Sequence, residues 1–316
     1  MYNISPKAYI PAIVLFIVGI AGIFLNRPPK IAEIDVLCYN IRLMPGNDKG
    51  RNHWSKRKKF LADSIRDAKA DIVCVQEAYR EQIDFIHSHV AGLTEVGVGR
   101  EDGVEAGEYS AILFRNHLFT LEDSGTFWLS STPSKVGSTT WGNGVTRICT
   151  WAKLTHIESG KRIDFFNTHF DRQSEECRRR GMALIARTIA ERPKPHGHVI
   201  LAGDFDAAED SWAYRYITGQ TGDSDVLPDD PTTEDVDPVA ASAPIVLRDT
   251  FRVLHPDESE VGTFHGFSGE ARGGKIDHIF VESEGCSVKA AEIWRLNRDG
   301  WYPSDHFPVR ATLRFR

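Results

Sequence analysis

The feature that most constrains the fold is a short apolar strand that ends at acidic residues. In "HVILAGDFD" the apolar run Val199–Ala202 is followed by Gly203 and then by Asp204 and Asp206. Apolar runs of this length, bounded by turn residues, are typical of strands that are buried on both faces. The pattern therefore predicts a core strand that presents two carboxylates at its tip.

Other strand-like segments of the chain end in the same way. Taken singly, each such polar residue fits a solvated loop or a satisfied core position. Ordered core strands share one edge, however, so residues at their tips can converge on a single cleft. Carboxylate and amide oxygens suit Mg²⁺ or Mn²⁺, and histidine supplies cationic or proton-transfer chemistry near neutral pH. The strand-end residues are Asn40, Glu77, His169, Asp171, Asp204, Asp206, Asp277, Asp305 and His306.

Two segments have helical rather than strand periodicity. Residues 53–70, "HWSKRKKFLADSIRDAKA", and residues 174–192, "SEECRRRGMALIARTIAER", each place apolar residues on one face. Ser174 is a candidate N-cap for the second helix. The basic runs "KRKK" at 56–59 and "RRR" at 178–180 are expected to lie on solvated faces. Strands outnumber helices, which favours an α/β protein of packed sheets with helices outside.

The first thirty residues differ from the rest. Residues 8–25 contain no charge and are just long enough to cross a bilayer, so we expect a single-pass membrane anchor. A cleaved signal, giving a secreted or periplasmic protein, and a buried helix are the alternatives. Flanking Lys7 and Arg27 give no clear orientation. We therefore divide the chain into an N-terminal segment, 1–30, and a catalytic domain, 31–316, which we expect to be monomeric.

Charge and cysteine content narrow the function classes. The formal net charge is −6, which argues mildly against a protein that coats nucleic acid, although a local basic patch would suffice for a nuclease. Five cysteines without close metal-type spacing predict buried free thiols. The acidic, Pro-rich segment 221–246 predicts a mobile surface loop.

The motifs together resemble the endonuclease/exonuclease/phosphatase superfamily, whose members are metal-dependent phosphoesterases with a deoxyribonuclease I-like fold. The resemblance spans roughly residues 34–315 and rests on "YNIR", "VCVQE", "GEYSAILFR", "RICTWAKL", "NTHFD", "LAGDFD", "KIDHIFV" and "YPSDHFPV". It implies a four-layer α-β-β-α sandwich, in which two packed mixed β-sheets are flanked by helices. "HWSKRK", "GTFWLSSTPSKVGSTTWG" and "GTFHGF" further resemble a bacterial branch that includes phosphatases of small phosphorylated sugars.

The resemblance also implies roles for single residues. Glu77 resembles the principal metal ligand, with Asn40 supporting it and Asp305 beside it. Asp204 resembles the acid that deprotonates water, and Asp277 the carboxylate that orients a phosphate-contacting histidine. The histidine that Asp277 orients is His306. The resemblance implies that His306, His169 and Tyr109 contact the phosphate. A single Mg²⁺ or Mn²⁺ with two histidines can stabilise the negative charge of phosphoryl transfer.

Asp206 departs from the family pattern, which has Asn at this position. An ionised Asp206 cannot donate a hydrogen bond and would repel a phosphate. It could instead bind metal or share a proton with Asp204. We therefore expect Asp206→Asn to keep substantial activity, and Asp204→Asn to lose nearly all of it.

Arginines are candidate handles for the substrate phosphate, and Arg147 and Arg178 are the two proposed here. The leading hypothesis is a phosphoester hydrolase of a small phosphorylated molecule: a sugar phosphate, inositol phosphate, nucleotide or lipid head group. The alternatives are a Mg²⁺-dependent nuclease and, less favoured, a catalytically inactive membrane-bound binding module.

Overall fold

The computed structural model describes residues 32–44, 46–222, 242–271 and 273–316. Two mixed six-stranded sheets form its centre. The first sheet runs in the order β11 (Cys286–Ile293), β12 (Val309–Phe315), β1 (Ala32–Asn40), β2 (Ile72–Ala78), β4 (Tyr109–Arg115) and β3 (Leu93–Val96). The second runs in the order β5 (Phe119–Trp128), β6 (Ile148–His156), β7 (Arg162–His169), β8 (His198–Asp204), β10 (Asp277–Glu282) and β9 (Leu247–Asp249).

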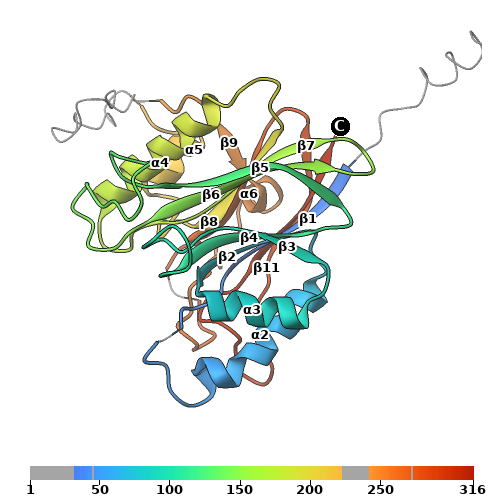
Figure 1. Ribbon diagram of the computed structural model, residues 1–316, viewed down its shortest axis with the longest axis vertical. Coiled ribbons are helices and arrows are strands. Elements are labelled where there is room, and N and C mark those ends of the chain that lie inside the picture. The colour runs from blue at the N-terminus through green and yellow to red at the C-terminus, as the bar shows by residue number, and fades with distance from the viewer. Residues whose placement is uncertain (1–31, 45, 223–241, 272) are drawn as a thin grey trace, which may run out of the picture.

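Helices cover the outer faces of both sheets (Figure 1). α2 (Trp54–Ala68) and α3 (Arg80–His89) pack on the first sheet, and α4 (Glu175–Ala190) and α5 (Trp212–Ile217) pack on the second. α6 (Thr250–Leu254) contacts β10 and β11, and a short 3₁₀ turn, η1 (Gly50–Asn52), precedes α2. The four-layer α-β-β-α sandwich expected from the sequence is confirmed.

Strand β1 shows why a core strand is apolar where it is covered on both faces, which in β1 is from Val36 to Tyr39. Val36 and Cys38 face the layer between the two sheets, whereas Leu37 and Tyr39 face α2 and α3. Successive side chains of a strand point to opposite faces, so a strand that is covered on both sides has no solvent-facing positions.

The helix at residues 174–192 forms as predicted, but the first helix departs from expectation. Ser174 caps α4 by accepting the Cys177 N–H at 3.2 Å. In α2, the prediction that "KRKK" is solvated is wrong for Arg57, which is fully buried. The physical reason is that backbone carbonyls from distant loops surround its guanidinium, which periodicity within one helix cannot indicate.

Several sequence expectations concern segments outside the described residues. The predicted anchor at 8–25 lies there, and so does most of the predicted loop at 221–246. Across the part of the chain that the structure describes, no helix combines the length and apolar character needed to cross a membrane. All five cysteines are free and buried, as predicted.

Candidate active site

Strand pairing brings five polar residues to one edge of the sandwich. β1 pairs in parallel with β2, and β7 with β8, so Asn40, Glu77, His169 and Asp204 lie together at strand ends. β10 runs antiparallel to β8 and begins at Asp277, the register partner of Asp204. The convergence predicted from the strand ends is therefore present for these five residues. Asp171 does not join them, because its carboxylate accepts the Gln173 and Ser174 N–H groups just before α4.

Asn40 connects the two sheets at this edge. Its amide nitrogen donates to Glu77 Oε1 at 3.1 Å and to Asp204 Oδ2 at 2.8 Å. Its Oδ1 accepts the Arg42 N–H at 3.0 Å, and Glu77 Oε2 accepts the Leu43 N–H at 2.8 Å. The backbone of Glu77 has a φ of 59°, which is uncommon for a residue other than glycine. Glu77 lies at the point where the β2–β4 register shifts. This local distortion accompanies a carboxylate that lines a cavity.

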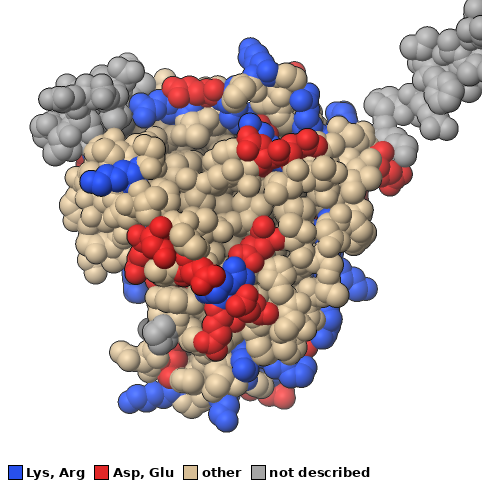
Figure 2. Space-filling view, in the orientation of Figure 1, with Lys and Arg blue, Asp and Glu red and all other residues tan. Residues whose placement is uncertain are grey.

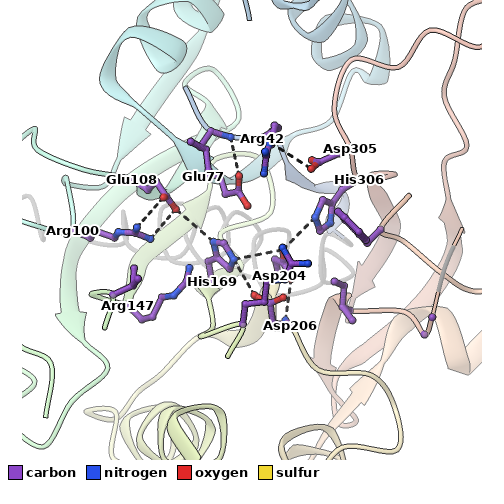
Figure 3. Close-up of a pocket in the computed structure, with 17 residues that line it drawn as sticks. Arg42, Glu77, Arg100, Glu108, Arg147, His169, Asp204, Asp206, Asp305 and His306 are labelled. Carbon is purple, nitrogen blue, oxygen red and sulfur yellow. Dashed lines mark hydrogen bonds and ion pairs between the residues drawn. The ribbon is translucent and has the colours of Figure 1, made fainter. Parts of the chain in front are cut away.

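Two histidines approach Asp204 from opposite sides (Figure 3). His306 Nε2 lies 3.8 Å and His169 Nε2 lies 3.7 Å from Asp204 Oδ2. On the far side of each ring, His306 Nδ1 is 2.9 Å from Asp277 Oδ2, and His169 Nδ1 is 3.9 Å from Glu108 Oε2. Each imidazole is therefore placed between Asp204 and a second carboxylate.

Glu77, Glu108, His169, Asp204 and His306 line a cavity of about 410 Å³. Asp206 lies beside His169, with 3.3 Å between Oδ2 and Nε2, and Asp305 lies 3.6 Å from the Arg42 Nε. Arg147 also lines the cavity and is only 9% exposed. Its Nε and Nη1 atoms are buried and make no hydrogen bond to any described residue.

Comparison with known proteins decides the family. The sequence model of the Endonuclease/Exonuclease/phosphatase family matches residues 37–306, from β1 to the second histidine of the cavity. The chain belongs to this family. A comparison with curated proteins gave no match.

Solved structures of endonuclease/exonuclease/phosphatase proteins resemble the chain along almost its whole length. One from Bacteroides thetaiotaomicron is 28% identical with a TM-score of 0.77, covering 92% of this chain and 97% of that one. One from Bacteroides vulgatus is 31% identical with a TM-score of 0.74, covering 90% and 100%. A third, described as a Bacteroides thetaiotaomicron mannosyl-6-phosphatase, is 28% identical with a TM-score of 0.72, covering 89% and 99%. The chain is a phosphoesterase, as the sequence predicts.

Endonuclease/exonuclease/phosphatase enzymes generally depend on a divalent metal ion, and the donor set of the cavity fits one. Ligand atoms lie within 4.8 Å of one another in two groups, His169–Asp204–Asp206 and Asp204–Asp277–His306. Glu77 is in neither group but adjoins them through Asn40, and its carboxylate and that of Asp305 line the same cavity. Such an ion stabilises charge on phosphoryl oxygens. The Asn40 amide nitrogen holds the carboxylates of Glu77 and Asp204, and its Oδ1 accepts the Arg42 N–H.

The carboxylates and histidines set one another's protonation. Burial, with Asp277 and Asp206 nearby, raises the pKa of Asp204 to about 7. Burial opposes protonation of His306, but Asp277 and Asp204 raise its pKa well above the ordinary value. Burial and then Arg147 lower the pKa of His169. The site thus combines a cationic imidazole, a neutral imidazole and a carboxylate that can exchange a proton near neutral pH.

Four predicted site residues do not line the cavity. Asn40 and Asp277 lie behind it and are hydrogen-bonded to residues that do, whereas Tyr109 and Arg178 point elsewhere. The Tyr109 hydroxyl donates to the Val104 carbonyl at 2.9 Å, and its ring packs between the first sheet and its helices. Alternation along the chain is the reason, because Glu108 faces the cavity and its neighbour faces away. Arg178 donates to the Asp171 carbonyl at 2.8 Å, at the loop before α4, and does not line the cavity.

Several other residues that line the cavity were not predicted from the sequence. Glu108 is held by two 2.8 Å hydrogen bonds from Arg100, and Phe264 packs against His306 with 5.1 Å between ring centroids. A signal existed for Glu108, since it directly precedes β4, which runs antiparallel to β2 and starts at the edge where β2 ends. Arg42 and Arg172 also line the cavity.

Proposed function

We propose that the chain releases phosphate from a small phosphorylated molecule, a sugar phosphate in the first instance, with Mg²⁺ or Mn²⁺. The observation that carries the proposal is the buried Arg147 guanidinium, whose Nε and Nη1 have no hydrogen-bond partner among the described residues. A buried charge without compensation is costly. A phosphate group in the adjoining cavity would supply that compensation through charge-assisted hydrogen bonds.

The size of the cavity supports a small substrate. A volume of about 410 Å³ lies within the range of small-molecule sites. Figure 2 shows Asp and Glu gathered near the middle of one face, with Lys and Arg mostly toward its edges, which disfavours a nucleic-acid duplex on that face. A relative described as a mannosyl-6-phosphatase supports a sugar phosphate.

The residues of the cavity suggest how each step is performed. Asp204 accepts a proton from the attacking water, because its pKa of about 7 suits a base at neutral pH. The water oxygen bonds to phosphorus as the ester P–O bond breaks, and the leaving alkoxide takes a proton from solvent. His306, kept cationic by Asp277, stabilises charge that develops on the phosphoryl oxygens. Arg147 and His169 hold the phosphate from the other side of the cavity, where Figure 3 places them. Glu77 and Asp305 would hold the metal ion.

The test is phosphate release by the purified full-length chain with Mg²⁺ or Mn²⁺. The panel contains sugar phosphates, inositol phosphates, nucleotides and glycerophospholipid head groups, with plasmid DNA and oligonucleotides as the nuclease arm. We expect turnover of at least one small phosphate ester. Turnover of nucleic acid alone would overturn the proposal in favour of the nuclease hypothesis.

A matched pair of arginine variants sharpens the test. Arg147→Gln should raise KM strongly, because it removes a buried cation whose Nε and Nη1 have no hydrogen-bond partner among the described residues. Arg178→Gln should leave KM unchanged, since Arg178 does not line the cavity and donates to the backbone carbonyls of Asp171 and Arg172. Equal effects in the two variants would contradict the assignment of Arg147 to the phosphate.

A further inference from the structure

Arg57 is a fully buried arginine that the catalytic scheme does not use. Its guanidinium donates to four backbone carbonyls: Asn52 at 3.0 Å, Ile41 at 2.7 Å, Pro303 at 3.1 Å and Arg42 at 2.8 Å. These carbonyls belong to the loop after β1, to η1 and to the segment that leads into Asp305. One side chain of α2 therefore joins three segments near the cavity.

Two of these carbonyls belong to peptide groups whose N–H ends point into the site. The peptide between residues 41 and 42 accepts from Arg57 at the Ile41 oxygen and donates from the Arg42 nitrogen to Asn40 Oδ1 at 3.0 Å. The next peptide accepts from Arg57 at the Arg42 oxygen and donates from the Leu43 nitrogen to Glu77 Oε2 at 2.8 Å. Consecutive peptides thus connect one guanidinium to both residues.

We infer that Arg57 is a positioning residue of this site, which fixes Asn40 and Glu77 through the two peptide groups between them and its guanidinium. The inference rests on the proposed metal-dependent function, because it concerns the residue that would hold the metal. A cation at the carbonyl end of a peptide polarises it and strengthens the hydrogen bond that its N–H donates. Arg42 has a left-handed φ of 59°, and Arg57 hydrogen-bonds to the peptide group on each side of it.

Only a guanidinium fits this environment. Its planar fork presents five donors in fixed directions, whereas an ammonium presents three donors at one point. Trp54 packs against the guanidinium with 5.1 Å to its ring centroid, and Phe267 lies at 5.9 Å. These rings restrict water from replacing a lost donor, so a carbonyl released by a shorter side chain stays unsatisfied.

The test measures metal binding without catalysis, by calorimetric titration of Mn²⁺ into the full-length chain. Arg57→Lys keeps the charge but cannot serve four carbonyls. We expect its dissociation constant for Mn²⁺ to rise about tenfold, the usual scale for losing groups that orient a metal ligand. Phosphate release by this variant should recover partly at high Mn²⁺. A folded Arg57→Lys chain with the wild-type dissociation constant would overturn the inference.

Two further variants separate positioning from general structure. Lys56→Met removes the neighbouring charge on the exposed side of the same helix, and should leave the dissociation constant unchanged. Gln82→Met removes the second donor to the Arg42 carbonyl, at 2.9 Å, and should weaken Mn²⁺ binding less than Arg57→Lys does. If Arg57→Lys does not fold, unchanged binding in Gln82→Met overturns the inference.

The proposed metal-dependent function and the positioning role of Arg57 can be refuted separately. A wild-type chain that takes up no Mn²⁺ overturns the metal-dependent function, and this inference with it. A wild-type chain that binds Mn²⁺ while Arg57→Lys and Gln82→Met bind it equally well overturns only the role of Arg57. A fall in the melting temperature of Arg57→Lys without a change in Mn²⁺ affinity would show a structural role alone, and would also overturn it.

Discussion

Adjacent residues of β10 belong to two buried charged clusters with different character. Asp277 lies behind the cavity and pairs with His306, which lines it. His278 faces the opposite side of the sheet and joins Lys275 and Asp249. Side chains alternate across a strand, so neighbouring positions serve different layers. The two clusters can therefore be compared within a single element.

The cluster around His278 is closed. Lys275 Nζ lies 2.5 Å from both Asp249 Oδ2 and His278 Nδ1, and His278 Nε2 lies 3.2 Å from the Ala207 carbonyl oxygen. The second oxygen of Asp249 accepts the Phe251 N–H at 2.9 Å. Both oxygens of Asp249 and both nitrogens of His278 thus have partners.

The cluster at the cavity is open by comparison. Asp277 Oδ1, His169 Nδ1 and two nitrogens of Arg147 are buried without a hydrogen bond to any described residue. Buried polar groups are normally satisfied, so a concentration of unsatisfied ones beside a cavity indicates capacity for a ligand. The comparison indicates that a cluster of buried charged residues marks a ligand site when some of its polar atoms lack hydrogen-bond partners.

The largest expected effect comes from removing the central carboxylate of the open cluster. Asp204→Asn should lower kcat about 10³-fold, the scale of a lost general base. Its melting temperature without metal should fall only slightly. The amide gives up one of the two oxygens that accept N–H groups, but burial and neighbouring carboxylates already disfavour the ionised Asp204. Steady-state phosphate release and thermal unfolding check both parts. A large loss of stability would mean that the open cluster, like the closed one, holds the fold together.

The closed cluster should respond in the opposite way. Lys275→Met leaves Asp249 without its ammonium partner, and breaking a buried pair in this manner costs about 3–5 kcal/mol of unfolding free energy. Urea denaturation measures the loss. The matched control is Lys289→Met on β11, where an exposed lysine should change stability by less than about 0.5 kcal/mol. Similar losses in both variants would refute the view that Lys275 is structural.

The two histidines should give stability opposite dependences on pH. Burial and Lys275 lower the pKa of His278, so its contribution is complete above about pH 6.5 and is lost as the pH falls. Despite burial, Asp277 and Asp204 raise the pKa of His306, so its contribution is complete below about pH 6.5 and is lost as the pH rises.

Melting temperatures measured in EDTA between pH 5 and 9 test this contrast. His278→Gln should flatten the acid side of the profile, and His306→Gln should flatten the alkaline side. Profiles that change on the same side in both variants would contradict the assigned directions of the two pKa shifts.

The sequence predicts the strand-end residues well because their placement depends on local information. An apolar run fixes the strand, and parallel pairing brings strand ends together, so Glu77, His169 and Asp204 could be placed before any coordinates were known. Choosing between adjacent residues was harder. Glu108 directly precedes β4 and Tyr109 begins it, so the two side chains point to opposite sides, and a shift of one position in the predicted strand reverses them.

Long-range contacts could not be predicted in this way. Arg57 is buried by carbonyls that include the one at Pro303, 246 positions away along the chain. In a run of basic residues at the start of a helix, the sequence does not show which side chain will hydrogen-bond to carbonyls of a distant segment. Arg178 shows a different difficulty, because its acceptors are the nearby carbonyls of Asp171 and Arg172, but the sequence does not indicate which way the side chain turns.

The smallest expected effect concerns Asp206, which stands where the resemblance leads one to expect Asn. Its backbone N–H donates to Asp204 Oδ1 at 3.0 Å, and burial raises the pKa of its side chain to about 6. Asp206→Asn preserves size and replaces a carboxylate that repels phosphate with an amide that can donate to it. We therefore expect kcat/KM to stay within about tenfold of wild type, the equivalent of one hydrogen bond. A loss as deep as that of Asp204→Asn, in the same phosphate-release assay, would show that Asp206 belongs to the essential machinery of the open cluster.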